Sequence, residues 1–192
     1  MSQRMMDDKF FNQCIVRDEC SKLHSVYSAI ESWEDLAVRE WQASRPDTTQ
    51  MSDLQADWAA DHFNDQAYMM HVTKQSMLGS LAVTIASSVE NFFGALCEDR
   101  NIQLGNRAGW GEKRQRLETD LGISCDDLTG IEQVTRVRLL GNCFKHNEGK
   151  VNSEFVDMCS GNEGNEIDFN IEDWETLIKS TERFLLDLIS HT

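Results

Sequence analysis

Polar residues that could bind a phosphate group recur along one side of the segment 132–151. Arg138, Asn142 and His146 follow one another four residues apart, and Lys145 directly precedes the histidine. A four-residue spacing places side chains one above the other on a single face of an α-helix. A cation, an amide and an imidazole in such a line could hold a phosphate, and an imidazole can exchange a proton near neutral pH.

The same residues also have a simpler interpretation as an ordinary helix end. Asparagine, lysine and histidine side chains near a helix C-terminus satisfy unpaired carbonyl groups and complement the negative end of the helix dipole. Asn147, Glu148 and Gly149 follow His146, and such a run is typical of the point where a helix stops. From residue types alone, both interpretations remain open.

The segment LLGNCFKHNEG resembles the signature helix of HEPN-superfamily domains, which are small all-α modules common in bacterial toxin and defence systems. The family pattern is an arginine, a polar residue that is often asparagine, a short spacer and a histidine, commonly followed by asparagine and glycine. Four positions match this pattern: Asn142, His146, Asn147 and Gly149. Gly141 occupies the position of the family arginine, Arg138 lies one turn earlier, and Lys145 adjoins the histidine.

The resemblance implies a symmetric homodimer in which two signature helices face each other across a cleft. Active members of the family cleave RNA there without a metal or other cofactor, by attack of the ribose 2′-hydroxyl on its own phosphate. Carried over, His146 would be the general acid or base, Arg138 or Lys145 would stabilise the phosphate charge, and Asn142 would orient the histidine. The expected function is therefore that of a toxin or defence endoribonuclease.

Two other functions are compatible with the sequence. Because Gly141 replaces the family arginine, the protein could be a catalytically degenerate HEPN-like module for dimerisation or partner binding. The net charge of −15 would also suit an antitoxin-like acidic partner of a basic protein. This charge argues against general nucleic-acid binding. However, residues 100–150 hold nine of the eighteen Lys and Arg residues against seven acidic ones, so the basic excess coincides with the signature segment.

Cysteine and histidine usage gives no support for a disulfide framework or a zinc site. The six cysteines include no CxxC pair, and the five histidines are dispersed. Together with a start that lacks the apolar region of a signal peptide, this pattern predicts reduced thiols and a cytoplasmic protein. We expect no membrane span, since no apolar run reaches about 18 residues.

The apolar periodicity predicts an all-α bundle of four to five helices in one domain, residues 1–192. The expected elements are one or two helices over 7–43, a central helix over 66–100, a short basic helix over 112–121, the signature helix, and a closing helix over 174–188 capped by Asn170. A short strand is expected at 167–169. A row of aspartates, at positions 53, 57, 61 and 65, indicates a solvated face or a mobile connector rather than an ion site.

Glu90 interrupts the apolar run of the central helix. A carboxylate buried without a partner costs several kcal/mol, so it must be paired or solvated. Arg136 and Arg138 are the expected partners. Glu90, Arg136 and Asn147 are then expected to support the catalytic residues without contacting the substrate. The alternative is that Glu90 lies on a wet edge of the helix beside Ser87 and Asn91.

Overall fold

The computed structural model describes residues 3–156 and 162–192. In this part of the chain the fold is all-α, as the sequence predicts. The helices are α1 (Gln3–Ala43), α2 (Asp53–Asp99), α3 (Trp110–Leu121), α4 (Ile131–His146) and α5 (Trp174–Ser190), with short 3₁₀ turns at η1 (Cys125–Asp127) and η3 (Phe169–Ile171). The basic helix inserted before the signature helix is α3.

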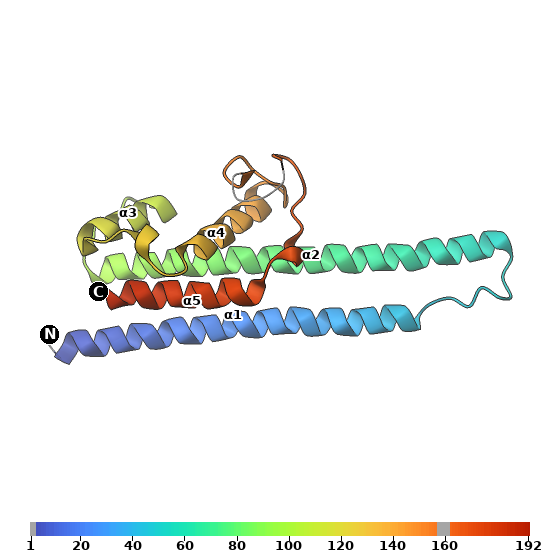
Figure 1. Ribbon diagram of the computed structural model, residues 1–192, viewed down its shortest axis with the longest axis horizontal. Coiled ribbons are helices and arrows are strands. Elements are labelled where there is room, and N and C mark those ends of the chain that lie inside the picture. Colours follow the sequence, from blue (N-terminus) through green and yellow to red (C-terminus); the bar gives the residue numbers. More distant parts are fainter. Residues whose placement is uncertain (1–2, 157–161) are drawn as a thin grey trace.

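Helices α1 and α2 form a long antiparallel hairpin that extends well beyond the other helices (Figure 1). The connection lies at 44–52, where Pro46 prevents α1 from continuing. Ser52 then begins α2, and its backbone N–H donates to Oε1 of Gln55 at 3.0 Å. The central helix is therefore longer than predicted. The aspartate row belongs to its first turns and is solvent-exposed, so the solvated face is confirmed and the mobile connector is wrong.

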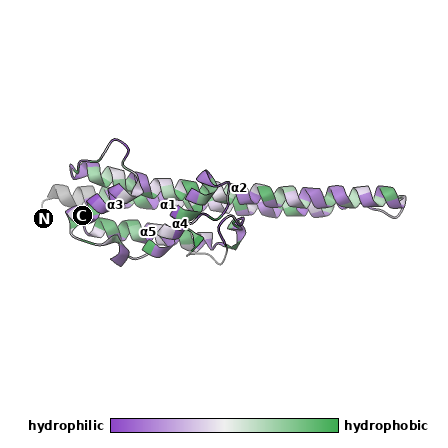
Figure 2. Cartoon of the chain, turned by 90° about the horizontal axis from the view of Figure 1, so that it is seen from above, coloured by the Kyte–Doolittle hydropathy of each residue, from purple (hydrophilic) through white to green (hydrophobic). Residues whose placement is uncertain are grey.

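The aromatic residues of the extended arm do not reach the main core. Trp58 is 77% exposed. The ring of Phe63 stacks on Trp41 of α1 at a centroid distance of 4.5 Å, and the Trp41 indole N–H donates to the carbonyl of Phe63 at 2.8 Å. These contacts fasten the two helices of the arm to each other. Hydropathy along the arm alternates between polar and apolar residues (Figure 2).

The main core lies where α4 and α5 pack against the hairpin. Buried residues from all five helices form one continuous cluster, with Phe93, Leu140, Trp174 and Phe184 among its largest members. Helix α4 crosses α2 closely because glycines lie at the contact. A Cβ on Gly79 would lie only 2.2 Å from the Phe144 ring, so the ring rests directly on the α2 backbone.

The segment before α5 differs from the sequence prediction in two details. The expected strand at 167–169 is absent from the described residues, where a single β-bridge joins Lys150 to Glu166 and η3 follows. The cap of α5 is Asp173, not Asn170, since Asp173 Oδ1 accepts the backbone N–H of Thr176 at 3.0 Å. Asn170 lies instead inside η3, one turn too early to cap α5.

Helix α2 is long and apolar enough, by length and composition alone, to cross a membrane. Its most apolar 18-residue window has a mean hydropathy of 1.3, and 39% of that window is buried inside the protein. The same helix packs against α1, α4 and α5. Apolar residues are required at those contacts, which accounts for part of the apolar composition of α2.

Candidate functional site

The four predicted catalytic residues share one side of α4, as their spacing predicts. Val137, Leu140 and Cys143 bury the opposite side of the helix in the core. On the polar side, Arg138 and Asn142 are half-buried, and Lys145 and His146 are exposed at the end of the helix. We call this row of four residues the α4 polar strip. Its position confirms the helical spacing but does not test a catalytic role.

Arg138 already has two partners at the far end of the strip. Its Nη2 lies 3.6 Å from Oε2 of Glu154, and its guanidinium carbon lies 6.0 Å from the centre of the Trp110 ring. Eight residues separate Arg138 from His146, which corresponds to about 12 Å along a helix. Within one chain, Arg138 and His146 are therefore too far apart to act on the same phosphate atom.

Gly141 lies at the crossing of α4 and α2 rather than on the polar strip. It is buried, and an added Cβ would lie 3.1 Å from the carbonyl oxygen of Ala82 and 3.2 Å from Cα of Val83. The two backbones approach closely because position 141 has no side chain. An arginine at this position would point into the α2 backbone, so the absence of the family arginine has a packing reason in this protein.

The residues that follow His146 fulfil the ordinary role of a helix end. The backbone N–H groups of Asn147 and Gly149 donate to the carbonyl of Cys143 at 3.0 and 3.1 Å. Gly149 has a φ of +77°, which favours glycine. The Asn147 side-chain amide donates to the carbonyls of Lys150 and Val151 at 2.9 and 3.3 Å. Asn147 therefore supports the loop after α4 and does not face a ligand.

The predicted partners of Glu90 were wrong. Glu90 Oε1 lies 3.1 Å from Nζ of Lys113 on α3. Arg136 instead forms a two-point contact with Glu172, with Nε–Oε2 and Nη2–Oε1 distances of 2.7 and 2.6 Å. The sequence could not supply this pairing, because nothing in it specified that α3 folds back against α2.

The basic residues around the signature segment are largely engaged in ion pairs. Arg114 contacts Glu118 at 2.9 Å and Asp126 at 2.8 Å, and Arg100 pairs with Asp120. Each such pair cancels a positive charge that a phosphate chain would need. The local basic excess therefore contributes less to anion binding than the residue count implies.

No candidate metal-binding site is found within residues 3–156 and 162–192. These residues include no group of three or more His, Cys, Asp or Glu side chains placed to hold an ion. Burial, with a smaller contribution from Glu182, raises the pKa of the Cys20 thiol to about 12. Burial and the nearby Glu118 raise the pKa of Cys125 to about 12 as well. Both residues therefore remain thiols near neutral pH and are poor metal ligands or nucleophiles.

The hairpin carries a second candidate surface, which sequence reasoning missed. An apolar hollow of about 610 Å³ lies between α1 and α2. We call it the hairpin groove, and its lining residues are Leu23, Val26, Ala29, Ile30, Trp33, Thr73, Ser76, Met77, Ser80, Leu81 and Thr84. None of them is ionisable. The sequence feature that could have indicated the groove is the row of small residues at positions 73, 76, 80 and 84, which share one side of a helix.

The hairpin groove and α4 lie on different sides of α2. Ser76, Ser80 and Thr84 line the groove, whereas Gly79 and Ala82 face α4. At 100° per residue, the centres of these two sets lie about 130° apart around the helix. Any partner in the groove would leave the α4 polar strip on the outer surface.

Comparison with protein-family models, curated proteins and solved structures finds no match to this chain.

Proposed function

We propose that this protein is a HEPN-like assembly module that pairs with a second copy of itself through the hairpin groove. The observation that carries this proposal is the groove: a large apolar hollow, without an ionisable lining residue, on the outer side of the longest helices. An apolar surface of this extent on a soluble protein marks an interaction site. Within one chain, the α4 polar strip does not bring an arginine and a histidine close enough to act on the same phosphate. This separation favours a binding role over a catalytic one.

The uncharged lining of the groove allows a second copy as the occupant despite the net charge. Two chains that each carry a net charge of −15 repel one another over most of their surfaces. Charged residues are 27% of the sequence, yet the eleven residues that line the groove include none. The groove is therefore a surface through which two acidic copies can meet with little electrostatic cost.

The groove is also complementary to itself in shape. Helix α1 contributes the bulky side chains of Val26 and Trp33. Helix α2 contributes small side chains near the same levels, at Ser80 and Thr73, beside the larger Met77 and Leu81. A two-fold axis parallel to the hairpin places α1 of each copy over α2 of the other, in antiparallel orientation. Bulky residues then lie over small ones, and the four helices form an antiparallel bundle.

The apolar part of the groove occupies the middle of the hairpin. The apolar lining on α1 spans Leu23 to Trp33, about 15 Å along the helix. Beyond Leu23, Glu19 and Lys22 lie on the same side of α1 and form an exposed ion pair at 2.7 Å. The lining would therefore be the apolar centre of the interface, and these charged residues would lie at its polar rim.

A matched pair of serine substitutions tests the interface. Ser80 lines the groove, whereas Ser28 is exposed on α1 and is not a lining residue. Ser80→Glu places a carboxylate from each copy in the apolar contact and should weaken dimerisation by about 100-fold or more. Ser28→Glu adds the same charge and should leave the dimerisation constant unchanged. Sedimentation equilibrium measures both, and a monomeric native protein at micromolar concentration would refute the proposal.

We propose metal-independent RNA cleavage as the second candidate function, because His146 is exposed at the end of α4 beside Lys145 and near Asn142. The native protein should then cut single-stranded RNA in EDTA and leave 2′,3′-cyclic phosphate ends. His146→Ala should lower the rate by about 10²–10⁴-fold, the usual loss when a general acid or base is removed. His62→Ala, at an exposed histidine on the hairpin, serves as the control. A folded native protein that cuts no RNA would exclude this function.

A further inference from the structure

A second, smaller cavity lies between the hairpin and η3, where residues far apart in the sequence meet. Its volume is about 220 Å³. Trp33 and Glu34 come from α1, His71 and Lys74 from α2, and Asn170 from η3. Apolar side chains complete the wall. Trp33 lies between the two helices and contributes to both this cavity and the hairpin groove.

The side-chain oxygen of Asn170 is buried in this region without a hydrogen-bond partner among the described residues. Exchange of its amide nitrogen and oxygen would not remove this deficit. The Asn170 nitrogen Nδ2 donates to Oδ1 of Asp168 at 3.0 Å, and a carboxylate can only accept. The nitrogen must therefore face Asp168, which leaves the oxygen free. A buried acceptor without a donor is costly, so it indicates a missing donor.

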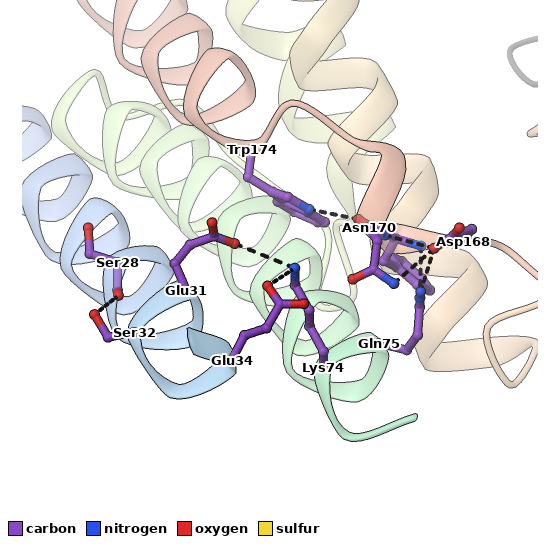
Figure 3. Close-up of polar contacts among 10 residues, drawn as sticks. Ser28, Glu31, Ser32, Glu34, Lys74, Gln75, Asp168, Asn170 and Trp174 are labelled. Atoms are coloured by element: carbon purple, nitrogen blue, oxygen red, sulfur yellow. Dashed lines mark hydrogen bonds and ion pairs between the residues drawn. The ribbon is translucent and has the colours of Figure 1, made fainter. Parts of the chain in front are cut away.

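The opposite wall of the cavity supplies acceptors and negative charge. Lys74 Nζ lies 2.5 Å from Oε2 of Glu34 and 3.6 Å from Oε1 of Glu31. The described contacts of Glu34 use Oε2, so its second oxygen can accept another hydrogen bond. The side chain of Asn170 lies between Asp168 and the Lys74–Glu34 pair (Figure 3). Two carboxylates, those of Glu31 and Glu34, contact one lysine here, which leaves an excess of one negative charge.

We propose that this cavity binds a small primary alkylammonium ion. An ammonium group has three N–H donors and no acceptor, which suits Asn170 Oδ1 and the second oxygen of Glu34. Its positive charge offsets the excess of carboxylates, and the indole of Trp33 offers an aromatic surface that attracts cations. The short alkyl chain would contact Ala37, Ala67 and Met70. This site is separate from the α4 polar strip and adds a ligand to the proposed assembly module.

Isothermal titration calorimetry with n-butylammonium chloride at constant ionic strength tests the proposal. The native protein should bind one equivalent, whereas n-butanol and sodium chloride, which lack the alkyl ammonium group, should give no saturable heat. Asn170→Ala and Glu34→Gln each remove one acceptor and should weaken binding by about tenfold or more. Ser32→Ala, at an exposed α1 residue that does not line the cavity, should bind as the native protein does.

Three results would overturn the proposal: no saturable binding of n-butylammonium by the native protein, equal binding of n-butanol, or native affinity in both cavity variants. The two variants lie on different elements, so a folding defect in one leaves the other informative. Circular dichroism shows whether each variant is folded before titration.

Discussion

At the scale of single residues, Gly141 decides how the signature segment should be interpreted. The family resemblance assigns this position to an arginine that faces a catalytic cleft. In this protein the position is buried against the carbonyl of Ala82, at the closest approach of α4 to α2. The absence of a motif residue can therefore have a packing cause. The sequence does not distinguish this cause from the loss of a cleft residue, because the distinction depends on where the backbone places the position.

Restoring the family arginine should consequently destabilise the protein without activating it. Gly141→Arg overpacks the helix crossing and should cost about 1–3 kcal/mol in the free energy of unfolding, or roughly 2–12 °C in Tm for a chain of this size. Asn142→Arg adds the same charge on the polar side of α4 and should lower the free energy of unfolding by less. Thermal unfolding followed by circular dichroism measures the difference. A Gly141→Arg protein of native Tm with new ribonuclease activity would show that the family interpretation is right.

At the scale of helices, apolar periodicity was sufficient to locate α1, α4 and α5, because each has one apolar side over a length of several turns. Helix α3 was predicted as a short basic helix without such a stripe, and Leu117 is its buried residue. The length of α2 could not be predicted from the same pattern. Its first turns carry aspartates and few core residues, yet Ser52 and Gln55 cap it at the N-terminus. Long-range pairs such as Glu90 with Lys113 were also beyond prediction, since they depend on how the helices fold back on one another.

The candidate sites show the same division between local and long-range information. The α4 polar strip could be predicted because its four residues lie on one helix, and the helical repeat alone places them on the same side. The hairpin groove and the cavity beside Asn170 could not, because each is built from helices that meet only in the folded chain. Residue types gave some indication of the groove, since small residues at positions 73, 76, 80 and 84 leave one side of α2 without bulky side chains.

At the scale of the whole molecule, the long hairpin gives the protein two different sides (Figure 1). One side of α2 carries α4, and a side about 130° away around the helix lines the hairpin groove. A dimer through the groove leaves the two α4 polar strips far apart on outer surfaces. A dimer of the kind that the family resemblance implies would bring the strips together and leave the grooves exposed. In the first assembly the two grooves are close together and the two polar strips are far apart, and in the second assembly the reverse holds.

Distances between spin labels on the two copies test this claim most directly. Labels are attached to Ser87→Cys or, separately, to Lys145→Cys, in a background where Cys14 and Cys159 are replaced by serine. Ser87 is exposed on α2 beyond the groove lining, so its label does not fill the contact. With helix layers about 8–10 Å apart, groove pairing predicts a distance below about 20 Å for the label at position 87 and about 30 Å or more for the label at position 145. A short distance at position 145 with a long one at position 87, or no coupling at either, would contradict the proposed assembly.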